Sequence, residues 1–264
     1  MKKPFWKRKI LQLGRKFGFN LVDSNVPAEL FPAILNFRHS TARPSESLES
    51  NFLSAVLNNF NNSKGQLCQD LLVLFLLNNK KNGFFVEFGA TDGVTLSNTF
   101  LLEKGYGWSG ILAEPAKNWQ TALRVNRNCT IDSRLVWEKS GEKLNFLEAT
   151  DAELSTISIF RGLDAHSESR KIKSEYFVET ISLNDLLASY NAPNQIDYLS
   201  IDTEGSEFAI LNKLNFSKYN FNVITVEHNF TETRQKLFKL LTSKGYKRIF
   251  EDFSQWDDWY IQDN

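Results

Sequence analysis

Two short motifs of the sequence contain residues that could bind a cofactor. Residues 83–93 read GFFVEFGATDG, and residues 110–115, about one helix later, read GILAEP. Each motif is an apolar segment that ends in polar residues, with Gly89 and Asp92 in the first turn and Glu114 after the second segment. In a strand–turn–helix–strand unit, glycines let a ligand approach the backbone, and an acid that ends the second strand can bind a ribose diol. The two motifs therefore predict a pocket for a ribose-bearing cofactor.

The residues of the first turn indicate which cofactor this pocket would accept. A dinucleotide site requires G-x-G-x-x-G so that helix amides can reach a pyrophosphate. This turn contains only Gly89 and Gly93, with Thr91 two positions after Gly89. Asp92 would place a negative charge where a phosphate would lie, unless it only caps the following helix. The turn therefore disfavours NAD or FAD and favours S-adenosylmethionine, which has no phosphate, carries an ammonium and a sulfonium, and has a ribose for Glu114.

The sequence resembles the FkbM family of S-adenosylmethionine-dependent methyltransferases over about residues 65–264. The matching segments are FFVEFGATDGVTLSNT, GILAEP, ELSTI (153–157), YFVETISLNDLL (176–187), IDYLSIDTEGSEFAIL (196–211) and VITVEHN (223–229). IDTEGSE is the most specific of these segments. The resemblance implies a class I methyltransferase fold and the methylation of a hydroxyl on a sugar or natural product.

The resemblance also implies roles for individual residues. Six residues in or near the first turn would line the methionine moiety, namely Glu87, Gly89, Asp92, Gly93, Ser97 and Asn98. Glu114 would bind the ribose hydroxyls, and the backbone near Val136 and Trp137 would contact the adenine. Trp137 could also stack on the base, or belong to the core. Thr91 stands where the common methyltransferase turn E-x-G-x-G-x-G has its middle glycine.

A second polar cluster follows two later segments, and it consists of Asp202, Glu204, Glu207, Glu227, His228 and Asn229. An alkyl hydroxyl has a very high pKa, so methyl transfer to it requires a base or a cation that stabilises the alkoxide. One hypothesis is a magnesium or manganese ion held by Asp202, Glu227 and either Asn229 or His228, because mainly oxygen ligands suit these metals. A second is metal-free catalysis with His228 or Asp202 as base. In either case Asp202, Glu227 and His228 would lie beside the acceptor oxygen. A third hypothesis is that the acids bind substrate hydroxyls or cap helices, and Glu207 is the best candidate for a cap.

Composition and charge restrict the class of protein and its partners. Hydrophobic residues make up 42% of the chain and aromatic residues 13%, which is a globular composition. The net charge is zero, so nucleic acid is not favoured as a partner. With two cysteines and no signal-peptide core or membrane-spanning segment, a cytoplasmic protein is expected. Its acceptor would be a glycan or glycolipid.

The amino-terminal part of the chain differs in charge from the rest. Seven lysines and arginines precede the first acid, Asp23, with apolar residues between them. This pattern predicts either a solvated helix or a basic amphipathic segment that contacts an anionic membrane surface. Residues 1–64 are interpreted as a lead-in to a methyltransferase domain at 65–264.

Strands and helices alternate through that domain. The expected strands are 83–88, 110–114, 135–137, 176–181, 196–201, 222–226, 246–250 and 258–262, with a hairpin at Gly141 returning along 144–146. The expected helices are 65–81, 95–104 ended by Gly105, one that starts near Pro115, one capped by Ser182, and 231–244. The charged segment 161–175 is either a lid or a plain connector.

This alternation predicts an α/β fold of the class I methyltransferase, Rossmann-like type. Its mostly parallel seven-stranded sheet would have helices on both faces, and the last two strands would pair antiparallel at one edge. Ligands bind at the carboxyl ends of such strands, where the two polar clusters would meet. An NAD(P)-dependent oxidoreductase would share this layout. A catalytically silent glycan-binding module on the same fold is the remaining alternative.

Overall fold

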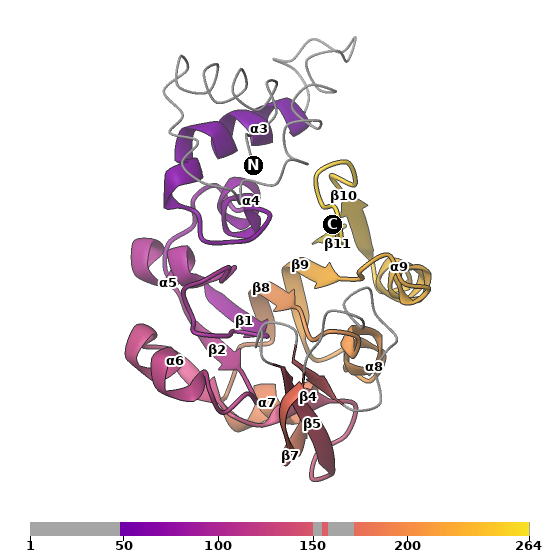
Figure 1. The fold of residues 1–264 in the computed structure, drawn as a ribbon. Helices are drawn as coiled ribbons and strands as arrows, with labels where there is room; N and C mark the ends of the chain where they lie inside the picture. Colours follow the sequence, from indigo (N-terminus) through magenta and orange to yellow (C-terminus); the bar gives the residue numbers. More distant parts are fainter. Residues whose placement is uncertain (1–47, 150–154, 158–171, 264) are drawn as a thin grey trace, which may run out of the picture. The chain divides into compact units, whose positions relative to one another are not determined.

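Strands and helices alternate along most of the chain, as shown in Figure 1. The computed structural model describes residues 48–149, 155–157 and 172–263. The chain divides into two units, 1–50 and 51–264, and every described residue except 48–50 belongs to the second. The basic amino-terminal segment and residues 161–171 of the predicted lid lie outside the described residues. The domain boundary at residue 65 and the membrane contact therefore stay predictions.

Seven strands form the main sheet in the order β10-β11-β9-β8-β1-β2-β3. Their bounds are β1 (Phe84–Phe88), β2 (Ser109–Ala113), β3 (Thr130–Asp132), β8 (Gln195–Ile201), β9 (Asn220–Glu227), β10 (Tyr246–Ile249) and β11 (Asp257–Gln262). Strands β3, β2, β1, β8 and β9 are parallel to one another, and β11 is antiparallel to both β9 and β10. The predicted mostly parallel seven-stranded sheet with an antiparallel pair at one edge is confirmed.

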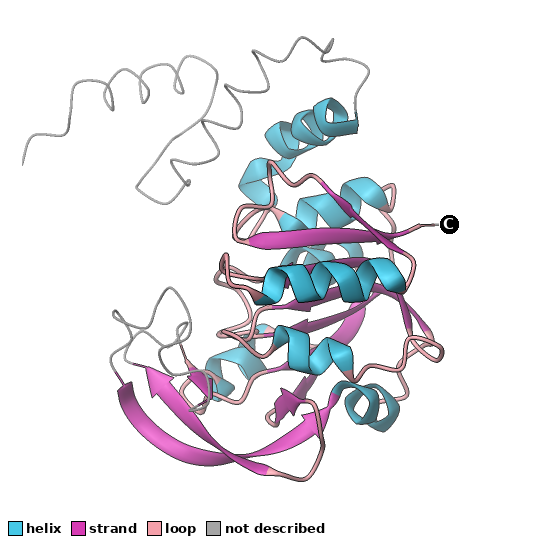
Figure 2. Cartoon of the chain, turned by 90° about the vertical axis from the view of Figure 1, so that its right-hand side faces the viewer, coloured by secondary structure: helices cyan, strands magenta, loops and turns pink. Residues whose placement is uncertain are grey.

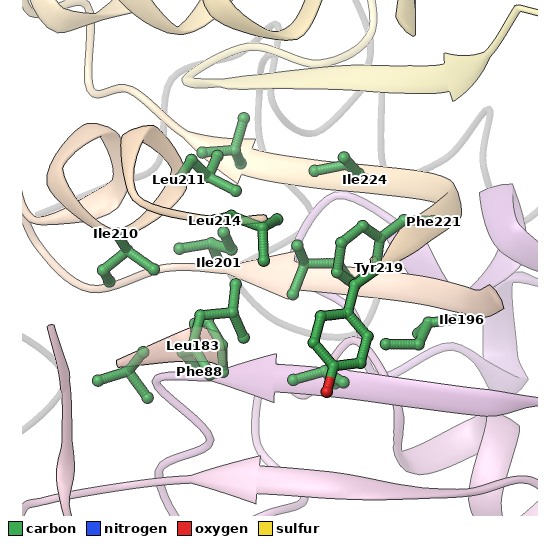
Figure 3. Close-up of a cluster of buried hydrophobic side chains, with 14 of the residues drawn as sticks. Phe88, Leu183, Ile196, Ile201, Ile210, Leu211, Leu214, Tyr219, Phe221 and Ile224 are labelled. Atoms are coloured by element: carbon green, nitrogen blue, oxygen red, sulfur yellow. The ribbon is translucent and has the colours of Figure 1, made fainter. Parts of the chain in front are cut away.

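Alternate residues of the central strands face opposite sides of the sheet, and each side is covered by helices. Phe85 packs with residues of α4 (Gln69–Leu76), α5 (Phe100–Tyr106), α6 (Gln120–Asn126) and α3 (Leu48–Asn59), which a short 3₁₀ turn (Phe60–Asn62) follows. Val86 and Phe88 pack on the other side with α7 (Leu183–Ser189), α8 (Glu207–Asn212) and α9 (Thr233–Ser243). Figure 3 shows part of this second cluster, in which Leu183 and Ile210 approach Phe88 and Ile201 from the helices.

The strand order reverses between β1 and β8. From β1 the chain continues to β2 and β3 on one side, and it later adds β8 and β9 on the other. In open α/β sheets, ligands bind in the crevice at the carboxyl ends of the strands at such a point. The polar residues that follow β1, β2, β8 and β9 are therefore brought to one edge of the sheet.

A second sheet contains four strands in the order β4-β7-β5-β6. They are β4 (Leu135–Trp137), β5 (Lys143–Ala149), β6 (Thr156–Ile157) and β7 (Ile172–Ser182), and β5 and β7 are the long curved strands at the bottom of Figure 2. The predicted hairpin between 135–137 and 144–146 is wrong. Strand β7 lies between β4 and β5, because it pairs parallel with β4 and antiparallel with β5. Strand β3 occupies the position beside β2 in the main sheet.

Helices α4 and α5 are shorter than the sequence predicts. The residues just before each helix have non-helical conformations, which hydrogen bonds to side chains or left-handed backbone angles impose. Helix α5 starts at Phe100 instead of 95, since the preceding segment binds the carboxylates of Glu87 and Asp92. It ends at Tyr106 and is capped by Gly107, which is left-handed, so Gly105 lies inside the helix and does not end it. Helix α4 covers Gln69–Leu76 only, and the residue before it, Cys68, is left-handed. No helix in the described ranges is both long and apolar enough to cross a bilayer.

Candidate active site

A cavity of about 490 Å³ lies at the carboxyl ends of the parallel strands. Its walls come from both sheets and from the loops after β1, β2, β8 and β9. The lining residues are Gln66, Glu87, Phe88, Gly89, Thr91, Thr95, Leu96, Asn98, Ala113, Glu114, Pro115, Leu135, Val136, Phe146, Ser155, Ser200, Asp202, Thr203, Glu204, Glu227, Asn229, Phe230 and Trp256. The volume is in the usual range for small-molecule sites.

Charge in the cavity is one-sided. Five carboxylates line it, those of Glu87, Glu114, Asp202, Glu204 and Glu227, and no lysine or arginine is among its described lining residues. A pyrophosphate would find no cation here and several negative charges. The cavity therefore suits a neutral or cationic ligand.

Glu114 follows β2 and is placed as the sequence predicts for a ribose ligand. It is buried, and its two carboxylate oxygens accept backbone N–H groups of Thr91 (2.9 Å) and Ala116 (2.8 Å). Each oxygen can accept a further hydrogen bond, so the side chain can still bind a diol from the cavity. Burial, with repulsion from Asp202 and Glu148, raises the pKa of Glu114 to about 7 even though the two N–H donors lower it.

The raised pKa predicts that cofactor affinity depends on pH. Ribose hydroxyls donate hydrogen bonds to the ionised carboxylate, so binding favours loss of the Glu114 proton. Affinity for S-adenosylhomocysteine should therefore rise as pH increases from 6 to 8, by up to about tenfold per unit below the pKa, and then level off. Calorimetry across this range measures it, with Glu114→Gln as the control. Glu114→Gln should bind more weakly at pH 8 and lack the slope, and an equal slope in both proteins would contradict the assignment.

Glu87 lines the cavity, but its carboxylate is bound by the chain that follows. It accepts hydrogen bonds from Ser97 Oγ (3.1 Å), Asn98 N (2.7 Å) and Thr99 Oγ1 (2.5 Å). The guanidinium of Arg127 lies 3.7 Å from it. Glu87 therefore shapes the segment that carries Asn98, and its contribution to ligand contact is through that segment.

Of three other residues predicted to contact the methionine moiety, one lines the cavity and two do not. Asn98 lines the cavity, donates to Ser200 Oγ (2.9 Å), and leaves its buried Oδ1 without a hydrogen-bond partner among the described residues. Ser97 and Gly93 do not line it. Ser97 is buried against Glu87, and the Gly93 carbonyl accepts from Arg127 (3.1 Å). Asn98 thus lies at the cavity, and its contact with the methionine moiety stays a prediction. Ser97 and Gly93 lie outside the cavity lining and support the loop.

Of the two residues predicted to matter in the first turn, Gly89 lines the cavity and Asp92 does not. Gly89 has φ +76°, and a Cβ there would overlap the carbonyl oxygen of Asp202, so only glycine lets the β1 and β8 loops meet. Asp92 does not line the cavity. Its carboxylate accepts the N–H groups of Val94 (2.8 Å) and Thr95 (2.7 Å). Burial alone would raise the pKa of Asp92, but these hydrogen bonds outweigh it and lower the pKa.

The prediction that Asp92 faces the ligand is therefore wrong. The alternative, a helix cap, does not hold either, because α5 begins only at Phe100 and Asp92 binds N–H groups of the turn before it. The physical reason is local, since short carboxylates readily bind the free N–H groups two and three residues later. Repulsion of a phosphate would come from Glu114 and the acids after β8 and β9 instead.

At the expected adenine end, Leu135 and Val136 of β4 line the cavity. Trp137 does not, and it packs in a cluster with Phe146, Ile157 and Val178. The core interpretation of Trp137 is the correct one. Leu135 is a lining residue that the sequence prediction missed.

The second polar cluster forms three close carboxylates at the cavity. One oxygen each of Asp202, Glu204 and Glu227 can be chosen so that all lie within 4.8 Å of one another. Burial, followed by repulsion from Asp202 and Glu204, raises the pKa of Glu227 well above its usual value. Asn229 lines the same cavity. Glu204 was considered in the sequence but not assigned as a ligand, although it lies in the most specific motif.

Two members of the predicted cluster have other roles. Glu207, the first residue of α8, accepts N–H groups of Thr203 and Gly205 (both 3.0 Å), so it fixes the loop before the helix instead of capping the helix as expected. His228 is buried and does not line the cavity. Its Nδ1 accepts the N–H of Phe230 (2.9 Å), and its Nε2 lies 3.1 Å from the Asp257 carbonyl oxygen. Prediction of His228 as a base or metal ligand is wrong, because strand β11 and the 228–230 turn occupy both ring nitrogens.

Strained backbone is concentrated around the cavity. Five lining residues other than glycine have positive φ, namely Thr91 (46°), Leu96 (56°), Glu204 (57°), Asn229 (44°) and Phe230 (55°). Each such residue costs about 1–2 kcal/mol. Strain of this kind persists where the surrounding structure fixes it, and it is typical of functional sites.

Comparison with known proteins is consistent with this cavity. The family model described as Methyltransferase FkbM domain matches residues 87–262. A solved FkbM methyltransferase from Methylobacillus flagellatus KT is 13% identical, with a TM-score of 0.44, and the match covers 98% of this chain and 71% of that one. An O-methyltransferase from Bacillus cereus in complex with SAH is 11% identical, with a TM-score of 0.36 and coverage of 96% and 95%. A precorrin-6y C5,15-methyltransferase from Geobacter metallireducens GS-15 is 14% identical, with a TM-score of 0.38 and coverage of 68% and 71%. No curated protein matches the sequence.

Proposed function

Since this chain belongs to the FkbM family and is an S-adenosylmethionine-dependent methyltransferase, we propose that it methylates a hydroxyl group of a sugar in a glycan or glycolipid. The observation that carries the proposal is the group of three carboxylates, Asp202, Glu204 and Glu227, at the cavity. A hydroxyl becomes nucleophilic only if its proton is removed or its negative charge is stabilised. Three close carboxylates can do the first directly, or the second by holding a divalent cation.

The described residues fit the cofactor. Bound S-adenosylmethionine supplies a methyl group on a sulfonium, which a nucleophile in line can accept. Glu114 offers two acceptor oxygens for the ribose hydroxyls, and the unpartnered Oδ1 of Asn98 can accept from the ammonium. Leu135 and Val136 give an apolar wall for the adenine. The absence of cations among the described lining residues matches a ligand without phosphate.

In the proposed reaction, Asp202, Glu204 and Glu227 lie beside the acceptor oxygen. One carboxylate would take the hydroxyl proton as the methyl group is transferred. Alternatively, the three would hold a magnesium or manganese ion, which would supply positive charge that stabilises the alkoxide. His228 takes no part in this chemistry. An oxidoreductase is disfavoured by the family match and by the lack of a cation for pyrophosphate.

Transfer of labelled methyl groups tests the proposed acceptor. Protein incubated with methyl-labelled S-adenosylmethionine and a cell-envelope extract should label material in the carbohydrate fraction. The label should survive mild alkali, which cleaves methyl esters but not ethers, and acid hydrolysis should release it as a methylated sugar. Label found only in alkali-labile or protein material would contradict a sugar hydroxyl as the acceptor.

The metal part of the proposal has its own test. If the three carboxylates hold a divalent ion, EDTA should lower methyl transfer by at least about tenfold, and Mg²⁺ or Mn²⁺ should restore it. S-adenosylhomocysteine binding should not change, because Glu114 and Asn98 need no metal. Asp202→Asn should lose both the activity and its response to added metal. Full activity in EDTA would exclude the metal and leave a carboxylate as the base.

A further inference from the structure

An exposed aromatic side chain stands at the opening of the cavity. Phe230 lines the cavity, yet 69% of its surface is exposed. It follows Asn229, which also lines the cavity, and both residues have left-handed backbone conformations. The Phe230 ring meets the His228 ring edge to face, with 5.3 Å between the centroids, and most of its surface still stays in water. The exposed part of an aromatic ring gains nothing from the hydrophobic effect, so this one contact does not account for a large side chain at this place.

The backbone under this ring is firmly fixed. The N–H groups of His228 (2.9 Å) and Asn229 (3.1 Å) both donate to the Trp256 carbonyl, and that of Phe230 donates to His228 Nδ1 (2.9 Å). The turn is closed by Thr231, whose N–H donates to the His228 carbonyl (2.8 Å). Each backbone N–H from 228 to 231 is therefore satisfied, while most of the Phe230 ring is left exposed. Such a turn holds the ring in place before any ligand arrives.

The chemistry next to the ring restricts what can bind against it. Asp202, Glu204 and Glu227 line the same cavity, and as carboxylates they can only accept hydrogen bonds when ionised. A ligand that touches both features needs an apolar face for the ring and several O–H donors along one edge. The carboxylates repel anionic ligands such as a nucleic-acid backbone. A neutral pyranose has the required face and edge.

We propose that Phe230 is the surface on which a neutral pyranose ring of the acceptor stacks, with its hydroxyl edge directed toward Asp202, Glu204 and Glu227. This proposal rests on the proposed function and adds the acceptor subsite to it. The C–H groups of one sugar face contact the negative face of the aromatic ring. Phe230 thus determines which acceptors bind, and it has no contact role in cofactor binding.

Saturation-transfer NMR on protein loaded with S-adenosylhomocysteine and Mg²⁺ tests the subsite. The probes are neutral methyl pyranosides of glucose, mannose, galactose and rhamnose, with glucose 6-phosphate as an anionic probe and catechol as a flat aromatic hydroxyl compound. At least one neutral pyranoside should bind, with the strongest saturation on the protons of one ring face. Glucose 6-phosphate should bind more weakly than the neutral sugars.

Variants of Phe230 separate stacking from folding. Phe230→Ala should weaken pyranoside binding by about tenfold, whereas Phe230→Trp should keep it, since a ring is restored. Phe177→Ala is a matched control, because Phe177 is 71% exposed on β7 and does not line the cavity. Phe177→Ala should change neither the affinity for pyranosides nor the affinity for S-adenosylhomocysteine. All three variants should bind S-adenosylhomocysteine like the wild type.

Several outcomes would overturn the proposal. One is equal pyranoside binding by wild type and Phe230→Ala. Others are binding of catechol but no pyranoside, and no pyranoside binding by protein that does bind S-adenosylhomocysteine. Failure to bind S-adenosylhomocysteine at all would count against the proposed function instead, so the two failures can be told apart.

Discussion

Replacing Arg127 with methionine should lower the free energy of unfolding by about 3–5 kcal/mol and weaken S-adenosylhomocysteine binding by more than about tenfold. The Arg127 side chain is fully buried and lies 2.7 Å from Glu103 and 3.7 Å from Glu87. It also donates to the Gly93 carbonyl (3.1 Å) and to Thr99 Oγ1 (2.9 Å). Methionine fills much of the same space but leaves the buried Glu87 carboxylate without its cation, and Glu103 keeps only Lys104 (2.9 Å) as a cation among the described residues. The segment that presents Asn98 to the cavity then loses its anchor.

Urea unfolding followed by tryptophan fluorescence measures the stability, and calorimetry measures the affinity. Arg124→Met is the matched control, because Arg124 lies on α6, the helix that ends just before Arg127, but is exposed and bonds only to Gln120 among the described residues. It should change stability by no more than about 0.5 kcal/mol. Adding Glu87→Gln to Arg127→Met should recover part of the loss, since the buried carboxylate left without a cation is then removed. Similar stability of the two arginine variants would show that the buried ion pairs contribute little.

The central strands could be predicted from the sequence because they are buried on both faces. Apolar runs such as FFV in β1 and ILA in β2 are typical of parallel strands covered by helices on both sides. The predicted segments 83–88 and 196–201 agree closely with Phe84–Phe88 and Gln195–Ile201. Strand β3 gave no such signal, because it has only three residues at the end of the sheet and two of them are half-exposed.

Partners that lie far apart in the sequence explain the errors in the second sheet. Strand β7 separates β4 from β5, and its pairing with β4 joins Leu135 to Thr180. A turn at Gly141 between two apolar segments predicts a hairpin from local evidence alone. Only the tertiary structure shows that β7 enters between them.

The same distinction between local and tertiary causes applies to the candidate site. The position of Glu114 follows from where β2 ends, which is a local property, and the structure places it at the cavity. The direction of the His228 side chain depends on hydrogen bonds to the 228–230 turn and to Asp257 of β11. The direction of Asp92 depends on φ and ψ in a turn whose middle residue, Thr91, is left-handed. Residue types and spacing could identify the cluster of acids, but not which side chains face the ligand.

Gly89→Ala should be the most damaging single-methyl substitution among those considered, with a loss of about 2–5 kcal/mol in stability. The backbone at Gly89 has φ +76°, which costs a residue with a Cβ about 1–2 kcal/mol. In addition, the new Cβ would overlap the Asp202 carbonyl oxygen, so the loops after β1 and β8 must separate. Asp202 would move with its loop, and a displacement of about 1 Å can lower the rate of methyl transfer on the order of 100-fold.

Gly141→Ala separates the cost of the dihedral angle from the cost of the overlap. Gly141 has φ +79°, almost the same as Gly89, but a Cβ there would meet no atom within 4 Å. It should therefore lose only about 1–2 kcal/mol and keep its activity and its affinity for S-adenosylhomocysteine. The difference between the two variants, measured by urea unfolding and by transfer of labelled methyl groups, is the contribution of the contact between Gly89 and Asp202. If that difference were close to zero, the close approach of the β1 and β8 loops would not be what positions the carboxylates, because the loops could separate without loss.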